Sequence, residues 1–184
     1  MATLADVAWP PAPIATARLT LRTTEASDRI GYMELLTSED VRRYLGGPMR
    51  REEVVRSMPE VPGRHPGVFA IELDGRFAGA VMVERRGSER PGHVHKEGNE
   101  LEISFTLLPE HWGHGYATEA VGAILAWTEE AFPDEPVLLC TQLANTRALR
   151  LAKRLGFQHV ETLKEFGAGQ WLGVRKRQTS SHPG

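Results

Sequence analysis

The chain has 184 residues, of which 41% are hydrophobic and 25% are charged. Because domains usually contain about 100–200 residues, this length predicts one globular domain with a sizeable core and excludes wholesale disorder. Lys and Arg total 22 against 24 Asp and Glu, so the net charge of −2 provides no overall positive field for holding nucleic acid or an anionic membrane.

The first half of the chain alternates strand and helix signals. Residues 1–17 are rich in Ala and Pro and predict an extended N-terminal arm. Beyond it, an alternating run predicts a strand at 18–23, apolar spacing that includes Ile30 predicts a helix at 24–36, and a further helical stretch at 38–57 is interrupted at Gly46-Gly47-Pro48. Asp74-Gly75 joins two apolar runs, 68–73 and 76–84, and predicts an antiparallel hairpin.

The second half begins with a polar segment, 85–98, that predicts an exposed loop. The next strand, 99–108, places apolar side chains on one face and Glu100, Glu102, Ser104 and Thr106 on the other. The later elements are expected as a helix at 115–132, a strand at 137–141, a helix at 145–155 and strands near 157–163 and 170–177. With a polar tail at 178–184 and no internal repeat, one domain over 18–177 is expected.

Several features bear on location and metal content. The one cysteine, Cys140, excludes an intramolecular disulfide and a cysteine-rich zinc site, and reads as a buried small hydrophobe. No apolar run reaches the roughly 18 residues of a spanning helix, and the N-terminus lacks a signal-peptide pattern. These last two features predict a soluble, cytoplasmic protein. His93 and His95 have no third ligand in view, so we expect no metal.

The stretch Glu110-His-Trp-Gly-His-Gly-Tyr-Ala-Thr-Glu-Ala120 is the most specific motif and lies between a predicted strand and a helix. Gly113 and Gly115 let the backbone approach a ligand and direct successive N–H groups to one point, and the helix that follows presents its positive dipole end. Such a loop suits a pyrophosphate. A Gly-x-Gly connection without a ligand is the alternative reading of this motif alone.

Further features accompany the motif. The strand before it is acidic on one face, Ala117 follows the glycines, and downstream stands Asn145-x-x-Ala148-x-x-Leu151-x-x-x-Leu155-Gly156-Phe157. From about Arg18 to Phe157 the chain resembles the GNAT acetyltransferase superfamily, most closely its ribosomal-protein N-terminal acetyltransferase-like branch. The resemblance implies one mixed α/β (α+β) domain around a mostly antiparallel sheet, with a V-shaped splay and helices on both faces.

The same resemblance implies acetyl-CoA as co-substrate and an amine as acceptor, either a protein N-terminus or a small molecule. The implied cofactor-binding residues are Phe105, Thr106 and Leu107 beside the pantetheine arm, Trp112, Gly113, His114, Gly115, Tyr116 and Ala117 around the pyrophosphate, and Asn145 and Ala148 near the thioether. Members of the superfamily often dimerise, so a homodimer is an open alternative.

Amide formation needs a neutral amine, so a base or a water chain must remove a proton. Glu102 stands at the strand carboxylate position of the superfamily, and Glu100 is expected on the same strand face, so one could hold the amine while the other or a water accepts the proton. Two exposed surface glutamates are the plainer alternative. Ala152 and Ala148 replace the Tyr and Ser that act as general acid in relatives, and this departure leaves open a non-catalytic acyl-CoA-binding module or an interaction domain.

Overall fold

The computed structural model describes residues 4, 9 and 11–176. Most of the expected arm before residue 11, and the whole expected tail at 178–184, lie outside the described residues.

An eight-stranded sheet with the order β1-β2-β3-β4-β5-β6-β8-β7 forms the centre of the fold. Its strands are β1 (Ile14–Ala15), β2 (Thr20–Arg22), β3 (Val68–Leu73), β4 (Arg76–Arg85), β5 (Leu101–Leu107), β6 (Val137–Gln142), β7 (Gln158–Glu165) and β8 (Ala168–Arg175). Neighbouring strands are antiparallel except β5 and β6, which are parallel. The predicted single domain with a mostly antiparallel mixed sheet is therefore confirmed.

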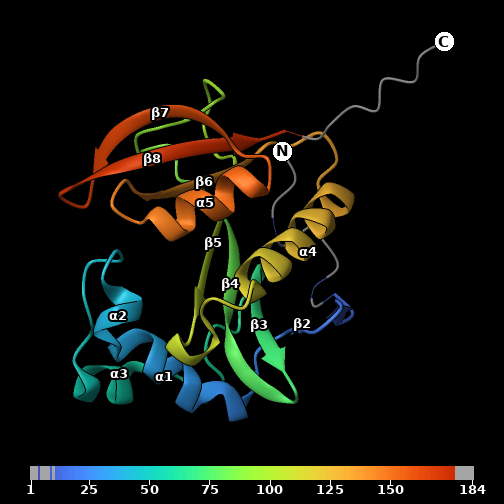
Figure 1. Ribbon diagram of the computed structural model, residues 1–184, viewed down its shortest axis with the longest axis vertical. Coiled ribbons are helices and arrows are strands. Elements are labelled where there is room, and N and C mark those ends of the chain that lie inside the picture. Colours follow the sequence, from blue (N-terminus) through green and yellow to red (C-terminus); the bar gives the residue numbers. More distant parts are fainter. Residues whose placement is uncertain (1–3, 5–8, 10, 177–184) are drawn as a thin grey trace.

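The parallel contact between β5 and β6 is short. It consists of the pairs Leu101 with Val137 and Glu102 with Leu138, and it ends there. Figure 1 shows β6, β7 and β8 lying across the upper end of β3, β4 and β5. The sheet therefore opens into a V between β5 and β6 immediately after Glu102. A V-shaped splay is what the resemblance implies.

Helices cover both faces of the sheet. They are α1 (Arg29–Thr37), α2 (Glu39–Arg42), α3 (Arg51–Ser57), α4 (Tyr116–Ala131) and α5 (Thr146–Arg154), with short 3-10 turns at Ala26–Asp28 and Pro109–His111. Ile124 of α4 packs in one core with Val81 and Ile103, whereas Leu35 of α1 and Val41 of α2 pack with Ala80 on the other face. Within the described part of the chain, no helix has the combined length and apolarity needed to cross a membrane.

Two expectations about the N-terminal region need correction. Ile30, expected with Met33 on the buried stripe of its helix, is 68% exposed; α1 buries Met33 as expected, together with Leu35. Order also begins before residue 18, since Ile14–Ala15 pairs with β2. Trp9 packs against Phe69 with ring centroids 5.1 Å apart, so the described part of the arm covers the core.

Glu119 of α4 connects this N-terminal segment to the glycine-rich motif. Its Oε1 accepts hydrogen bonds from Thr16 Oγ1 at 2.7 Å and from the backbone N–H of Arg18 at 2.8 Å, and its Oε2 accepts from Arg18 Nε at 2.8 Å. Arg18 Nη1 also donates to the carbonyl of His114 at 2.9 Å. The side chain of one motif residue thus fixes the loop and the start of α4 against β1 and β2.

We predict that Glu119→Ala lowers the free energy of unfolding by about 1.5–3 kcal/mol, because it removes charge-assisted hydrogen bonds from three donors. The control is Glu130→Ala, an exposed residue of the same helix, for which we expect a change within about 0.5 kcal/mol. Urea unfolding of both variants measures the difference. Equal values for the two variants would contradict this role of Glu119.

Candidate active site

The loop that joins β5 to α4 is open where a ligand would approach it. Gly113 and Gly115 both have φ near +83°, a left-handed conformation that favours glycine. A Cβ added at Gly113 would meet nothing within 4 Å, and one at Gly115 would meet Arg18 Nη2 at 3.5 Å. Protein atoms therefore leave this space to a ligand, and a side chain on either glycine would extend into it.

The same loop presents a row of unused donors. The backbone N–H groups of residues 113–118 donate no hydrogen bond to another described residue, and the next one, that of Glu119, donates to the carbonyl of Gly115 at 3.1 Å. Because these groups stand at the positive end of the 16-residue α4, the arrangement attracts an anion. A pyrophosphate has the negative charge and the oxygen atoms to accept hydrogen bonds from several of these N–H groups at once.

The strand before the loop offers a free backbone edge. Pairing with β6 ends at Glu102, so the groups of residues 103–107 that point away from β4 have no strand partner. Trp112 fixes the loop to this edge by donating from Nε1 to the carbonyl of Leu107 at 2.9 Å. Phe105 consequently has its backbone groups open to an extended, amide-containing ligand, whereas the Thr106 carbonyl faces Gly79 of β4.

The start of α5 lies beside the same loop. Asn145 caps this helix, because its Oδ1 accepts from the backbone N–H of Ala148 at 3.2 Å. The guanidinium of Arg147 stacks over the Trp112 ring, 5.0 Å from its centroid. The structure thus brings together three of the sequence-predicted groups: the glycine-rich loop, the free part of β5 and the Asn145 turn.

A cluster of four charged side chains lies where the V opens. Arg86 Nη1 and Arg90 Nη1 donate to Oε2 of Glu102 at 2.9 and 2.8 Å, and both arginines also pair with Glu165 of β7. Arg86 has no exposed surface and additionally donates to the carbonyls of Pro91 and Gly92. We call Arg86, Arg90, Glu102 and Glu165 the charge cluster.

The charge cluster corrects two expectations. Arg86, placed by its sequence context in an exposed loop, is wholly buried because it neutralises two carboxylates. Glu102, for which an exposed surface position was one alternative, is only 6% exposed. Its Oε1 accepts no hydrogen bond from any described residue, so one oxygen stays available to a ligand.

Glu100 does not share the environment of Glu102. It precedes β5, its Oε1 accepts from the N–H groups of Val94 and His95, both at 2.7 Å, and its Oε2 lies 2.6 Å from His93 Nδ1. Burial acts to raise the pKa of Glu100, but these hydrogen bonds outweigh it and the net pKa is below the ordinary value. Both oxygens hold the loop, which favours Glu102 over Glu100 as the group that meets an acceptor.

Cys140 of β6 lies beside the charge cluster, with its Sγ 3.9 Å from Glu165 Oε2. Burial first, and then the negative charge of Glu102, raise the pKa of this thiol to about 11. Because the thiolate is the nucleophilic form, Cys140 is poorly suited to accept an acyl group at neutral pH. Over the described ranges, no group of three or more His, Cys, Asp or Glu side chains could hold a metal ion.

Arg86 and Arg90 are functional-site residues that the sequence did not predict. The available signal was indirect: a glutamate in a strand that becomes buried needs a buried opposite charge, and the neighbouring loop is the nearest source of arginine. Which arginine turns inward depends on the path of the whole loop from 86 to 100, and that path has no local sequence signature.

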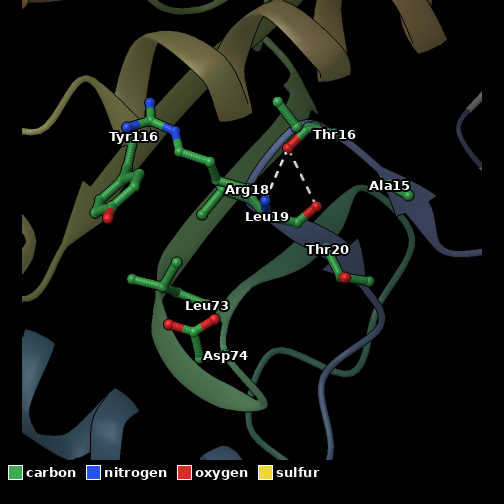
Figure 2. A pocket seen from close by; sticks show the side chains of 9 residues that line it. Ala15, Thr16, Arg18, Leu19, Thr20, Leu73, Asp74 and Tyr116 are labelled. Atoms are coloured by element: carbon green, nitrogen blue, oxygen red, sulfur yellow. Dashed lines mark hydrogen bonds between the residues drawn. The ribbon is translucent and has the colours of Figure 1, made fainter.

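A separate hollow of about 480 Å³ lies on the outer side of the N-terminal segment. Figure 2 shows Arg18 reaching toward Tyr116, with Leu73 and Asp74 below them. The guanidinium of Arg18 lies 4.5 Å from the centre of the Tyr116 ring. Tyr116, at the start of α4, lines this hollow, but neither β5 nor the charge cluster does, so the hollow adjoins the glycine-rich loop and not the opening of the V.

Residues 18–158 match the family described as Acetyltransferase (GNAT) domain, and the chain belongs to this family. It is an acetyl-CoA-dependent acetyltransferase. A relative, the uncharacterized N-acetyltransferase p20 of Bacillus licheniformis, is 23% identical over 157 residues, which cover 82% of this chain and 85% of the relative.

Solved structures share the fold. The aminoglycoside acetyltransferase AAC(6')-Ib in complex with coenzyme A has a TM-score of 0.70 at 19% identity, with 87% of this chain and 95% of that chain covered. RimL, a ribosomal-protein α-N-acetyltransferase, in complex with coenzyme A has a TM-score of 0.66 at 15% identity, with 89% and 97% covered. At these identities the likeness concerns the fold.

We predict that in Glu100→Gln the free energy of unfolding decreases less than in the wild type when the pH is lowered. A carboxyl whose folded-state pKa is depressed contributes stability above its unfolded pKa, roughly 4.3, and loses that contribution as pH falls through the folded value. Urea unfolding at about pH 7 and pH 4 should therefore show a smaller decrease for the variant than for the wild type. A decrease of the same size in both proteins would show that Glu100 carries no such linkage.

Proposed function

We propose that this protein transfers the acetyl group of acetyl-CoA directly to a primary amine while both substrates are bound, with no acetyl-enzyme intermediate. The observation that carries the proposal is the row of unpartnered N–H groups at residues 113–118, placed next to the open edge of β5. One feature fits the pyrophosphate of coenzyme A and the other fits the amides of its pantetheine arm. Together they lead the thioester to the opening of the V.

The contacts with the cofactor would come mainly from the backbone. Residues 112–117 would surround the pyrophosphate, and Phe105, Thr106 and Leu107 would line the pantetheine arm, with the Leu107 carbonyl already used by Trp112. Asn145 and Ala148 would border the thioether end. Because the donors are fixed by the fold, binding would need little reorganisation of the protein.

The chemistry needs a neutral amine beside the thioester carbon. We propose that Oε1 of Glu102 binds the acceptor ammonium and begins its deprotonation, directly or through a water. The amine nitrogen then forms a bond to the carbonyl carbon, and backbone N–H groups near Phe105 and Thr106 stabilise the oxyanion. The C–S bond breaks as the carbonyl reforms, and the amine nitrogen loses its remaining extra proton to solvent.

The departing coenzyme A thiolate needs no protein acid. Ala148 and Ala152 stand where relatives carry a Ser or a Tyr, and both are buried in this fold. A thiol of ordinary pKa, roughly 8.5, gives a thiolate stable enough to leave first and to take its proton from water afterwards. The absence of an acid side chain at these two positions is therefore compatible with turnover.

The acceptor we favour is cationic, because carboxylates surround the opening of the V. Membership of the ribosomal-protein N-terminal acetyltransferase branch would make a protein N-terminus the acceptor, and RimL supports this by its fold. AAC(6')-Ib, whose name specifies an aminoglycoside, supports a small-molecule amine in the same way. Both acceptors present a primary amine to the same carboxylate.

We predict that acetyl-CoA binds at about micromolar concentration and that the double variant Gly113→Asp/Gly115→Asp loses at least ~100-fold in affinity. The two side chains would fill the open loop and add negative charge where the pyrophosphate approaches. Isothermal titration calorimetry of both proteins measures the effect, with Gly167→Asp, at the exposed β7–β8 turn, as a control for an added charge at a positive φ. No binding by the wild type would remove the cofactor site from the proposal.

We also predict that Glu102→Gln lowers kcat/KM at least ~10-fold, whereas Cys140→Ser leaves it within ~3-fold of wild type. The first change removes a carboxylate that meets the amine, and the second removes a thiol with no part in direct transfer. Release of the coenzyme A thiol measures both rates. A loss under ~3-fold for Glu102→Gln, or an acetyl group found on Cys140 during turnover, would contradict direct transfer with Glu102.

A further inference from the structure

We propose that Glu84 of β4 is a second carboxylate that contacts the acceptor amine and receives its proton. This inference rests on the acetyl transfer proposed above and names a residue for one step of it. Nothing in the glycine-rich motif or in its resemblance to a family points to Glu84.

Glu84 is placed next to Glu102 by the pairing of β4 with β5. The two residues are directly opposite in the antiparallel ladder, and the next pair on the same face is Met82 with Ser104. Side chains opposite each other in such a ladder have Cβ atoms about 4.5–5.5 Å apart. Because side chains alternate along a strand, both glutamates point to the face on which Ala80 meets α1 and α2, opposite the face covered by α4.

The carboxylate of Glu84 has no partner of its own. It is half-buried, and it makes no hydrogen bond or ion pair with the residues the structure describes. Three neighbouring glutamates differ: Glu102 and Glu165 are both paired with Arg86 and Arg90, and both oxygens of Glu100 accept hydrogen bonds from the 93–95 loop. A partly buried carboxylate without a partner is costly unless a ligand supplies one.

Charged groups from three neighbouring segments face Glu84. They are Glu102 on β5, Arg86 and Arg90 from the loop that follows β4, and His65 from the loop before β3. Burial is the largest influence and raises the pKa of Glu84, and the charge of Glu102 raises it further. The cations act in the opposite direction but more weakly, so the net pKa of Glu84 lies above the ordinary value, as suits a proton acceptor.

The two carboxylates can therefore divide the work. Oε1 of Glu102 holds the ammonium, and the proton proposed above to go to Glu102 goes instead to the carboxylate of Glu84, directly or through one water. The neutral amine then attacks the thioester carbon, coenzyme A leaves as its thiolate, and the nitrogen loses its second proton to solvent to give the amide. Glu84 returns its proton to solvent before the next cycle, so no group on the enzyme changes overall.

The test compares Glu84→Gln, Glu84→Asp and the exposed control Glu130→Gln with the wild type. Coenzyme A release is followed with phenethylamine, spermidine and an unblocked tetrapeptide, and acetyl-CoA binding is measured by calorimetry in parallel. We expect Glu84→Gln to lower kcat by about 100-fold with acetyl-CoA affinity unchanged within ~2-fold, and Glu84→Asp to restore part of the rate. Glu130→Gln should match the wild type.

The pH profile separates a proton acceptor from a structural residue. A base must be deprotonated to act, so wild-type kcat should rise with pH through the pKa of Glu84, with the same midpoint for amines of different basicity. Glu84→Gln should lose this rise, and Glu84→Asp should keep it with a shifted midpoint. A second measurement needs no turnover: in ¹³C-carboxyl NMR titrations, phenethylammonium should lower the pKa of Glu84, because a bound cation favours the carboxylate.

The outcomes distinguish this inference from the proposed function. If the wild type releases coenzyme A and Glu84→Gln keeps kcat within ~3-fold with an intact pH rise, Glu84 is not the proton acceptor and acetyl transfer still stands. If the wild type binds acetyl-CoA but releases no coenzyme A with any of the amines, the proposed transfer to them fails. In that case an unchanged Glu84 titration with phenethylammonium overturns the Glu84 assignment too.

Discussion

Parallel pairing between β5 and β6 stops after Glu102, and the position of that stop sets the geometry of the active site. Backbone groups inside a protein need hydrogen-bond partners, so a strand that loses its neighbour must find another partner or face water. In β5 the unpaired part leads directly to the glycine-rich loop, which also has unused N–H groups. A ligand that carries amides at one end and phosphates at the other satisfies both. In the proposed function, the fold would therefore bind coenzyme A largely through its main chain.

The charge cluster stabilises the same opening through side chains. Removing Arg86 and Glu102 from water is expensive, and the expense is offset only because each arginine meets two carboxylates and Arg86 also meets loop carbonyls. The cluster joins the end of β4, β5 and β7 across the gap between the two halves of the sheet. It also fixes the Glu102 carboxylate with Oε2 turned inward, so the reactive oxygen is positioned before any acceptor arrives.

Locally encoded features were predictable from the sequence. Asp74 and Gly75 adopt the positive φ values that a two-residue hairpin turn needs, Asn145 caps α5, and the glycine-rich loop has its conformation built into Gly113 and Gly115. Features that depend on distant segments were not predictable. The burial of Arg86 requires Glu165, which is far along the chain, and the inward turn of Glu100 toward the 93–95 loop depends on the path of that loop. Periodicity placed Ile30 on an apolar stripe, but no other element packs there.

This difference between local and distant contacts explains why the sequence predicts the cofactor but not the acceptor. The proposed cofactor site is the backbone of one continuous strand-loop-helix unit, so a short motif is sufficient to recognise it. The proposed acceptor face instead combines β4, β5, the loop after β4 and the β7–β8 turn. In that turn Phe166 is 80% exposed, and its ring centre lies 5.9 Å from the Arg90 guanidinium. Arg90 already shows which chemistry this surface binds, since its cation contacts two carboxylates and an aromatic ring. Those contacts are already filled by Arg90, so the charge left for an acceptor comes from Oε1 of Glu102 and from Glu84, and these two groups favour a cation over an anionic acceptor.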